Sequence, residues 1–210
     1  MRTTFLQLLE QQRWDDHRLY HRSRINQTLH LVSAIGFLVA YVVLFFDPAL
    51  AALIGWGWSM STRQSGHFFF EPQDYDDVNQ MSNEHKEAIK TGYNLRRKVV
   101  LIAAWAAVPV LFWLTPSLGG MITPAQGFAG WLHDVGIAWL ALGVAGLVFR
   151  VLQLFATQGV LAGLAWATKI ITDPVHDIQM YWKSPLALLR GELLDPMDHV
   201  REHLQGAAKA

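Results

Sequence analysis

Residues 31–60, LVSAIGFLVAYVVLFFDPALAALIGWGWSM, contain a single charged residue, Asp47, between two apolar blocks. The first block, Leu31–Phe46, ends at Asp47-Pro48, a pair typical of a turn. The second block extends over residues 49–70. Long uncharged runs are what a bilayer requires, because each spanning helix must cross roughly 30 Å of hydrocarbon. We therefore predict a helical hairpin that crosses a membrane twice.

Two further apolar blocks follow, Val99–Leu114 and a block that begins near Trp131 and reaches Arg150. The chain has 210 residues, enough for one domain, and 52% of them are hydrophobic. We predict an all-α protein: a polytopic membrane helix bundle that forms a single integral membrane domain over residues 1–210. About four transmembrane helices are expected, at about residues 28–46, 49–70, 99–115 and 131–152.

The segment after the fourth block is harder to assign. Residues 151–171 are apolar, but no polar turn separates them from that block, so we expect a helix that leaves the membrane or lies along it. The pairs Asp173-Pro174 and Asp195-Pro196 each place an N-cap acid before a proline, which is typical of a helix start. The tail, residues 156–210, is therefore predicted as short cytoplasmic amphipathic helices.

The distribution of positive charge predicts the orientation. All 17 lysines and arginines lie before the first block, between Arg63 and Lys98, or from Arg150 onward. The Asp47-Pro48 turn and the loop 115–132 carry none. Cytoplasmic loops are enriched in these residues, so both termini and the loop 71–98 are predicted to be cytoplasmic. We expect either a bacterial inner membrane or the endoplasmic reticulum, and the sequence does not distinguish the two.

Composition excludes several classes of protein. The chain has no cysteine, which excludes disulfides, thiolate zinc sites, iron–sulfur clusters and cysteine nucleophiles. The formal net charge is zero, so no nucleic-acid partner is expected. Nine histidines allow a metal to be held by nitrogen and oxygen ligands. Nothing in the sequence defines the oligomeric state.

Depth along the hairpin brings two histidines to one level. His30 lies 17 residues before Asp47, and His67 lies 19 residues after Pro48. At about 1.5 Å per residue these positions are roughly 26 and 29 Å from the turn. The two imidazoles are therefore expected side by side where the membrane meets the cytoplasm.

A carboxylate and an amide accompany these histidines. Asn26 shares a helix face with His30, and Glu71 shares one with His67, since each pair is four residues apart. Ionisable groups at membrane depth are costly and usually serve the activity. We therefore predict that this patch is functional.

The remaining histidines are less easily placed. His21 lies nine residues before His30 and would face the opposite side of a straight helix, so it joins the patch only if the helix begins or bends between them. Ser23 or Asn26 could cap such a start. His176 is a further candidate, which Asp177 or Asp173 could orient. Polar or solvated positions are expected for His17, His85, His133, His199 and His203.

Two motifs in residues 14–75 resemble those of a known family. They are His21-x4-Asn26-x3-His30 before one span and Gly66-His67-x-x-Phe70-Glu71 at the end of the next. Together they are similar to the metal-dependent 2-hydroxy-fatty-acid dioxygenases, small multi-span membrane enzymes of lipid α-oxidation. The chain departs from that family after Glu71, where Pro72-Gln73-Asp74-Tyr75 replaces a basic, proline-alanine stretch, and in its long tail.

The resemblance implies an iron(II) enzyme that uses dioxygen to shorten a 2-hydroxy fatty acid by one carbon. On this hypothesis the iron ligands are His21, His30, His67 and His176, and Glu71 is either a ligand or the base that takes the hydroxyl proton. Asn26 would orient a ligand or the substrate carboxylate. Three arginines could attract the acid head group: Arg22, Arg24 and Arg63.

Two alternatives stay open. A di-iron membrane lipid hydroxylase or desaturase would use the His-x3-His pairs His17/His21 and His199/His203, although such enzymes usually carry histidine doublets and this chain has none. A non-enzymatic membrane scaffold subunit, or a small transporter, would carry the patch without catalysis. Transport is disfavoured because no charge lies at the middle of a span.

Overall fold

The computed structural model describes residues 4–209, apart from the side chains of Leu95 and of residues 207–209; residue 210, the last of the predicted tail, lies outside the described part. Helices account for 78% of the structure, and no strand occurs in the described residues, so the predicted all-α class is confirmed. The elements are α1 (Phe5–Tyr20), α2 (Arg24–Val43), α3 (Pro48–Ala52), η1 (Leu53–Met60), α4 (Ser61–Ser65), η2 (Gly66–Phe70), α5 (Asn83–Ile89), α6 (Leu95–Leu114), η3 (Leu118–Gly120), α7 (Gly127–Gln158), α8 (Val160–Tyr181), α9 (Ser184–Leu189) and α10 (Asp198–Lys209).

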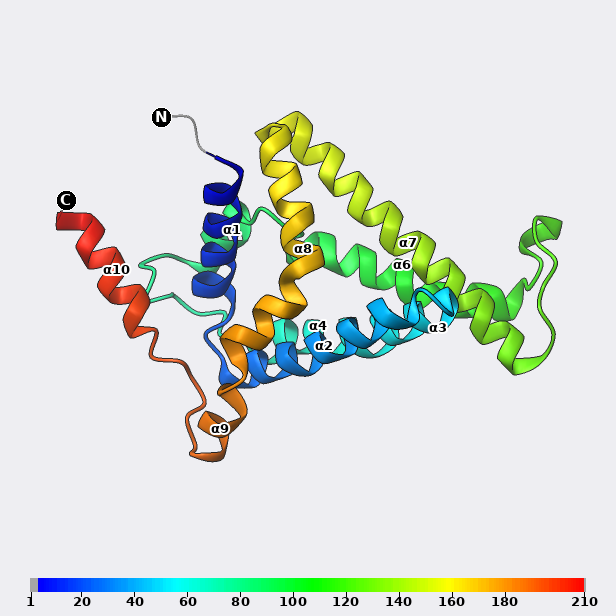
Figure 1. Ribbon diagram of the computed structural model, residues 1–210, viewed down its shortest axis with the longest axis horizontal. Coiled ribbons are helices and arrows are strands. Elements are labelled where there is room, and N and C mark those ends of the chain that lie inside the picture. The colour runs from blue at the N-terminus through cyan, green and yellow to red at the C-terminus, as the bar shows by residue number, and fades with distance from the viewer. Residues whose placement is uncertain (1–3, 210) are drawn as a thin grey trace.

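A helical hairpin about Asp47-Pro48 is present, whereas its crossing of a membrane stays a prediction. Asp47 is the N-cap of α3, and its side chain accepts a hydrogen bond from Leu50 N at 2.9 Å, while Pro48 opens the helix. From α3 the chain continues through η1, α4 and η2 as one helical path, because every junction between these pieces has right-handed helical backbone angles. The two π-helical pieces lie within this returning arm, which packs against α2 (Figure 1).

Three helices are long and apolar enough to cross a membrane: Arg24–Val43, Arg96–Leu114 and Gly127–Gln158. Four spans were predicted, and the second apolar block is the one missing, because it is divided among α3, η1, α4 and η2. Large apolar side chains on the long helices face outward; Trp113 and Phe149 are 69% and 63% exposed. Exposed apolar surface of this extent is typical of contact with lipid, so the structure is compatible with a membrane protein.

The segment after α7 differs from the prediction. Gly159 adopts a φ of +92°, a conformation that glycine tolerates, and there the chain reverses direction. Helix α8 then packs back against α1, α2 and α7 instead of continuing away from the bundle (Figure 1). The predicted helix start at Asp173 is wrong, because α8 runs through Pro174. The Asp173 side chain is instead paired with Lys169 at 2.9 Å, four residues earlier on the same helix.

Tryptophan contacts and close backbone packing stabilise one end of the bundle. This end contains the Asp47-Pro48 turn and the loop 115–132. Trp139 of α7 donates from Nε1 to the carbonyl of Trp105 at 2.9 Å, and the two rings stack with centroids 5.0 Å apart. Gly136, one turn before Trp139, lies directly on α3: a Cβ there would be 2.5 Å from the carbonyl oxygen of Ala49. The absence of a side chain therefore sets the α3–α7 distance.

Replacing Gly136 by alanine should destabilise the protein by about 1–3 kcal/mol, since backbone atoms of α3 would have to move to admit the methyl group. Thermal unfolding in detergent measures this effect. Gly146→Ala on the same helix is the matched control, because a Cβ there meets only Leu101 Cδ2 at 3.9 Å. That control should be neutral or up to about 1 kcal/mol more stable. Equal destabilisation by both changes would contradict the close α3–α7 packing.

Candidate metal centre

Three separate elements supply the histidines of the centre. His21 follows α1, His30 lies on α2, and His67 lies on η2. Helix α1 ends at Tyr20, and Ser23 caps the new helix α2, its hydroxyl accepting from Asn26 N at 3.3 Å. The break lets His21 turn toward His30, so the condition stated for His21 from the sequence is met, with Ser23 as the cap.

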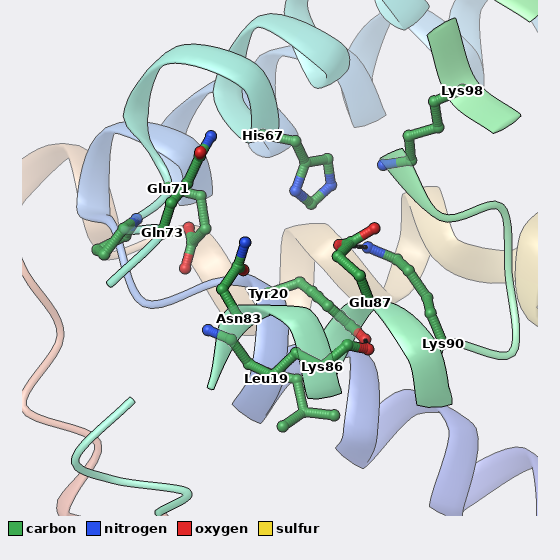
Figure 2. A pocket seen from close by; sticks show the side chains of 11 residues that line it. Leu19, Tyr20, His67, Glu71, Gln73, Asn83, Lys86, Glu87, Lys90 and Lys98 are labelled. Carbon is green, nitrogen blue, oxygen red and sulfur yellow. Dashed lines mark hydrogen bonds and ion pairs between the residues drawn. The ribbon is translucent and has the colours of Figure 1, made fainter. Parts of the chain in front are cut away.

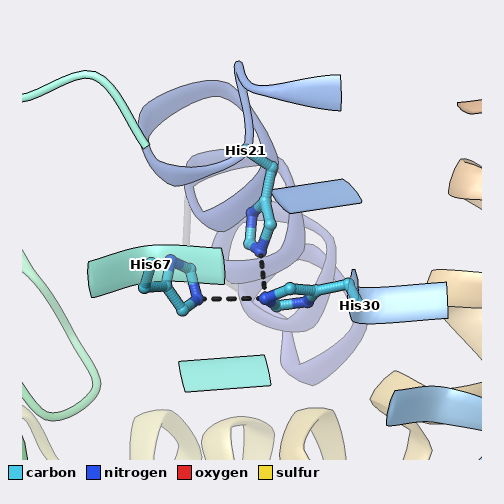
Figure 3. A group of neighbouring side chains, drawn as sticks. All are labelled: His21, His30 and His67. Carbon is cyan, nitrogen blue, oxygen red and sulfur yellow. Dashed lines mark hydrogen bonds between the residues drawn. The ribbon is translucent and has the colours of Figure 1, made fainter. Parts of the chain in front are cut away.

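The three imidazoles converge through their Nε2 atoms (Figure 3). His30 Nε2 lies 3.2 Å from His21 Nε2 and 3.1 Å from His67 Nε2. The level placement of His30 and His67 expected from the hairpin is thus observed. Together these three side chains form the one group of potential metal ligands found in the described residues, with ligand atoms within 4.8 Å of one another.

The surroundings of Nδ1 in His21 and His30 indicate which ring nitrogen carries the proton and which has the free lone pair. His21 Nδ1 lies 2.9 Å from the carbonyl oxygen of Asp16, which can only accept, so this nitrogen carries the proton. His30 Nδ1 lies 3.4 Å from a carboxylate oxygen of Asp177 without a hydrogen bond to it, and a proton on Nδ1 would face that acceptor. With the protons on Nδ1, both Nε2 atoms are unprotonated, and their lone pairs face each other across 3.2 Å. A cation between them removes that repulsion.

The spacing of the nitrogens fits a metal ion. With metal–nitrogen bonds of about 2.1 Å, neighbouring ligands lie about 3.0 Å apart in an octahedron and about 3.4 Å apart in a tetrahedron. The separations of 3.1 and 3.2 Å from His30 Nε2 lie between these values, and the third pair, His21 and His67, is wider but within 4.8 Å. Burial lowers the pKa of His21 well below its usual range, and His30 lowers it further, which keeps the His21 ring neutral as a metal ligand requires. Three imidazoles leave coordination positions for other ligands.

Asp177 lies next to a histidine of the centre that the sequence did not connect with it. It was considered as a partner of His176, but its carboxylate faces His30 Nδ1 and is ion-paired with Arg63. An acid hydrogen-bonded to a ligating imidazole fixes the ring's orientation and raises its basicity. Asp177 is placed for this role, although its contact with His30 Nδ1 at 3.4 Å is not a hydrogen bond in this structure. Only the return of α8 against α2 brings Asp177 to this position.

Glu71 and Asn26 hold the scaffold of the centre. Glu71 Oε1 accepts from Arg22 N at 2.7 Å, and Oε2 accepts from Ser23 N at 3.3 Å and from Asn26 Nδ2 at 2.8 Å. Burial raises the pKa of Glu71 above its usual range, while these three hydrogen bonds act to lower it. The carboxylate thus joins the end of η2, just after His67, to the turn that carries His21.

The position before His67 has no room for a side chain, which explains the glycine at residue 66. A Cβ at this position would lie 2.1 Å from Asn26 Oδ1 and 3.2 Å from Asn26 Cα. The glycine lets η2 approach α2 closely enough for the two imidazoles to meet.

Replacing Glu71 by alanine should lower the free energy of unfolding by about 1–3 kcal/mol, because buried backbone donors of the 21–23 turn lose their acceptor. Metal affinity should fall as a consequence, and Glu71→Gln, which keeps one carbonyl acceptor, should lose less of both. Unfolding in detergent and metal titration measure the two effects. Complete metal loss in Glu71→Gln at unchanged stability would instead make Glu71 a ligand.

The other candidate residues are distributed as follows. His176, on α8, is half-buried and lies outside the group of three. The prediction that His17 is solvated is wrong: it is buried, 3.2 Å from the Tyr181 hydroxyl and 3.1 Å from His199 Nε2. Burial, with a smaller contribution from His199, lowers the pKa of His17 to about 4. Its role is to join α1 to α8 and α10.

A cavity of about 350 Å³ extends from the centre into the bundle. His30 and His67 line this cavity, together with acidic and basic side chains from α1, α6 and α8. Its remaining walls are mostly apolar and come from α2, η1, α6, α7 and α8: Phe37, Tyr41, Trp56, Met60, Leu101, Ile102, Leu142, Leu147, Trp166 and Ile170. Arg63 lines the cavity, whereas Arg22 and Arg24 do not; Arg24 is paired with Asp195 at 2.9 Å.

A second, smaller cleft of about 40 Å³ approaches His67 from the loop side (Figure 2). Glu71, Asn83 and Lys86 contribute polar groups to it, and Tyr20 borders both spaces. The histidines therefore lie between a polar approach and a largely apolar cavity.

These features define a class: an α-helical protein compatible with a membrane, with a three-histidine centre that could bind a metal at the end of an amphipathic cavity. A comparison of the chain with family models, with curated proteins and with solved structures gives no significant match. The dioxygenase resemblance therefore rests on the two motifs alone.

Proposed function

We propose that this chain is an iron(II)-dependent dioxygenase that removes one carbon from 2-hydroxy fatty acids at the cytoplasmic face of a membrane. The observation that supports this most is the convergence of three Nε2 atoms at the charged end of a cavity with apolar walls. Imidazole ligands with open positions suit non-haem iron(II), which must accept both a substrate and dioxygen. The two motifs around His30 and His67 support the same class.

Each part of the chain has a task in this proposal. His21, His30 and His67 would hold the metal, and Asp177 would orient His30. Bound iron(II) would supply a Lewis acid and a centre at which dioxygen can react. The hydroxyl and carboxylate of a 2-hydroxy acid can chelate such a metal, while the apolar walls receive the acyl chain and exclude water. One dioxygen converts the acid to carbon dioxide, water and the acid one carbon shorter, which balances atoms and electrons.

The membrane arrangement belongs to the same proposal. The helical path from Pro48 to Phe70 has 23 residues. At about 1.5 Å per residue this is roughly 34 Å, long enough to cross the hydrocarbon as a fourth span beside the three apolar helices. Both termini and the loop 71–98 would be cytoplasmic, with the metal centre at that interface.

The test is an assay of purified protein in detergent, loaded with iron(II) without oxygen and then mixed with 2-hydroxyhexadecanoic acid and dioxygen. We expect pentadecanoic acid as product, with about one iron per chain, as one three-histidine group allows. Loading with zinc or manganese in parallel identifies the active metal. Bound iron without turnover of any 2-hydroxy acid would overturn the dioxygenase proposal. Two irons per chain would favour a di-iron hydroxylase.

A further inference from the structure

One of the cationic side chains at the charged end of the cavity has no acidic partner in the described residues. Four cationic side chains line the cavity, and three of them are paired with acids in the structure. Arg63 is paired with Asp177, and Lys90 with Glu87 at 3.7 Å. Lys169 lies between two acids, Asp173 at 2.9 Å and Asp16 at 3.0 Å. The fourth cation is Lys98, whose Nζ forms no hydrogen bond or ion pair within the described residues.

Lys98 lies beside the metal centre. It belongs to the first turn of α6, and both the cavity and the smaller cleft are lined by Lys98 together with His67. Figure 2 shows its side chain extending from α6 toward the imidazole of His67. An ammonium group placed next to a divalent metal is repelled by it, and a partly buried charge without a partner is costly. An anion bound between the two would remove both penalties.

The continuation of α6 favours an anion that carries an alkyl chain. Leu101 and Ile102 lie three and four residues after Lys98, so they share its face of the helix, and both line the cavity. A ligand with its head group at Lys98 would therefore place its chain against apolar side chains. This order of charge followed by apolar wall matches a fatty acid.

We infer that Lys98 binds the carboxylate of the fatty-acid substrate, and this inference rests on the proposed function. Lys98 therefore has the role that the sequence suggested for three arginines, the attraction of the acid head group. These arginines are Arg22, Arg24 and Arg63. Arg63 already neutralises Asp177, and the other two lie outside the cavity. The ammonium orients the acid so that its hydroxyl and carboxylate point toward the three Nε2 atoms.

Binding without turnover tests the inference. Protein loaded with zinc, which does not react with dioxygen in this way, is titrated with 2-hydroxydecanoic acid, its methyl ester and decyl phosphate in the same detergent. Calorimetry gives the dissociation constants. The wild type should prefer the acid over the ester, and Lys98→Met should weaken acid binding about 10- to 100-fold while leaving ester binding unchanged, as for the loss of a charged hydrogen bond.

Two further variants make the result specific. Arg97→Met removes an exposed cation from the adjacent position on α6 and should leave the acid preference intact. Lys98→Arg keeps the charge and should restore most of the preference. Lys98→Met should unfold no earlier than the wild type, because it removes an unpaired charge, so loss of binding would not reflect misfolding.

The outcomes separate this inference from the proposed function. An unchanged acid-to-ester preference in Lys98→Met, or a wild-type preference for decyl phosphate over the acid, would overturn the assignment of Lys98 even if the iron enzyme turns over. A lost preference in Lys98→Met without any product from the iron-loaded wild type would support the carboxylate site and reject the dioxygenase.

Discussion

Purified His67→Ala protein should contain almost no metal, whereas the wild type should bind about one ion per chain, as a site with three protein ligands allows. His67 supplies one of three converging nitrogens, and it lies 3.1 Å from the central ring, His30. Two remaining imidazoles cannot hold the ion at comparable affinity. Elemental analysis after dialysis against a weak chelator measures the loss.

His176→Ala is the matched control for this experiment. The same residue type is removed, but His176 lies outside the group of three, so metal content should equal that of the wild type. Both variants should keep the helical circular dichroism of the wild type. Full metal occupancy in His67→Ala, or metal loss in His176→Ala, would contradict the assigned ligand set.

Asp177→Ala should weaken metal binding about 10- to 100-fold, the usual effect of removing the acid behind a ligating histidine. The carboxylate faces His30 Nδ1 and neutralises Arg63, so its loss frees the ring and leaves a buried cation next to the metal. Competition with a fluorescent chelator gives the change in affinity.

Asp177→Asn separates the two contributions. It keeps an oxygen that can face His30 Nδ1 but removes the negative charge, so its metal affinity should fall between those of the wild type and Asp177→Ala. An affinity in Asp177→Ala equal to that of the wild type would show that Asp177 acts only as an ion-pair partner of Arg63, which also lies 4.0 Å from Asp173. The neighbouring variant His176→Ala again serves as the control.

Much of the hairpin could be predicted because its geometry is local. The Asp47-Pro48 turn and the constant rise of a helix suffice to bring His30 and His67 to one level, and the structure places their Nε2 atoms 3.1 Å apart. His21 required only a helix break, for which Ser23 is a recognisable cap. These inferences depend on residues near one another in the sequence.

The second half of the chain could not be predicted equally well. Gly159 is one glycine in an apolar run, and only its φ of +92° shows that the chain reverses there. Asp173-Pro174 has the composition of a helix start, but the pairing of Asp173 with Lys169 within α8 decides otherwise. A local capping signal was thus outweighed by a salt bridge and by packing against α1 and α2.

The sequence by itself determined the helical class, the apolar blocks and the common level of His30 and His67, because charge distribution, helix rise and capping are properties of neighbouring residues. Only the tertiary structure decided which groups surround those histidines. Asp177 is 147 residues from His30, and Lys98 extends toward His67 from another helix. Such contacts depend on how α6 and α8 pack against the hairpin, and no spacing along the chain encodes that packing.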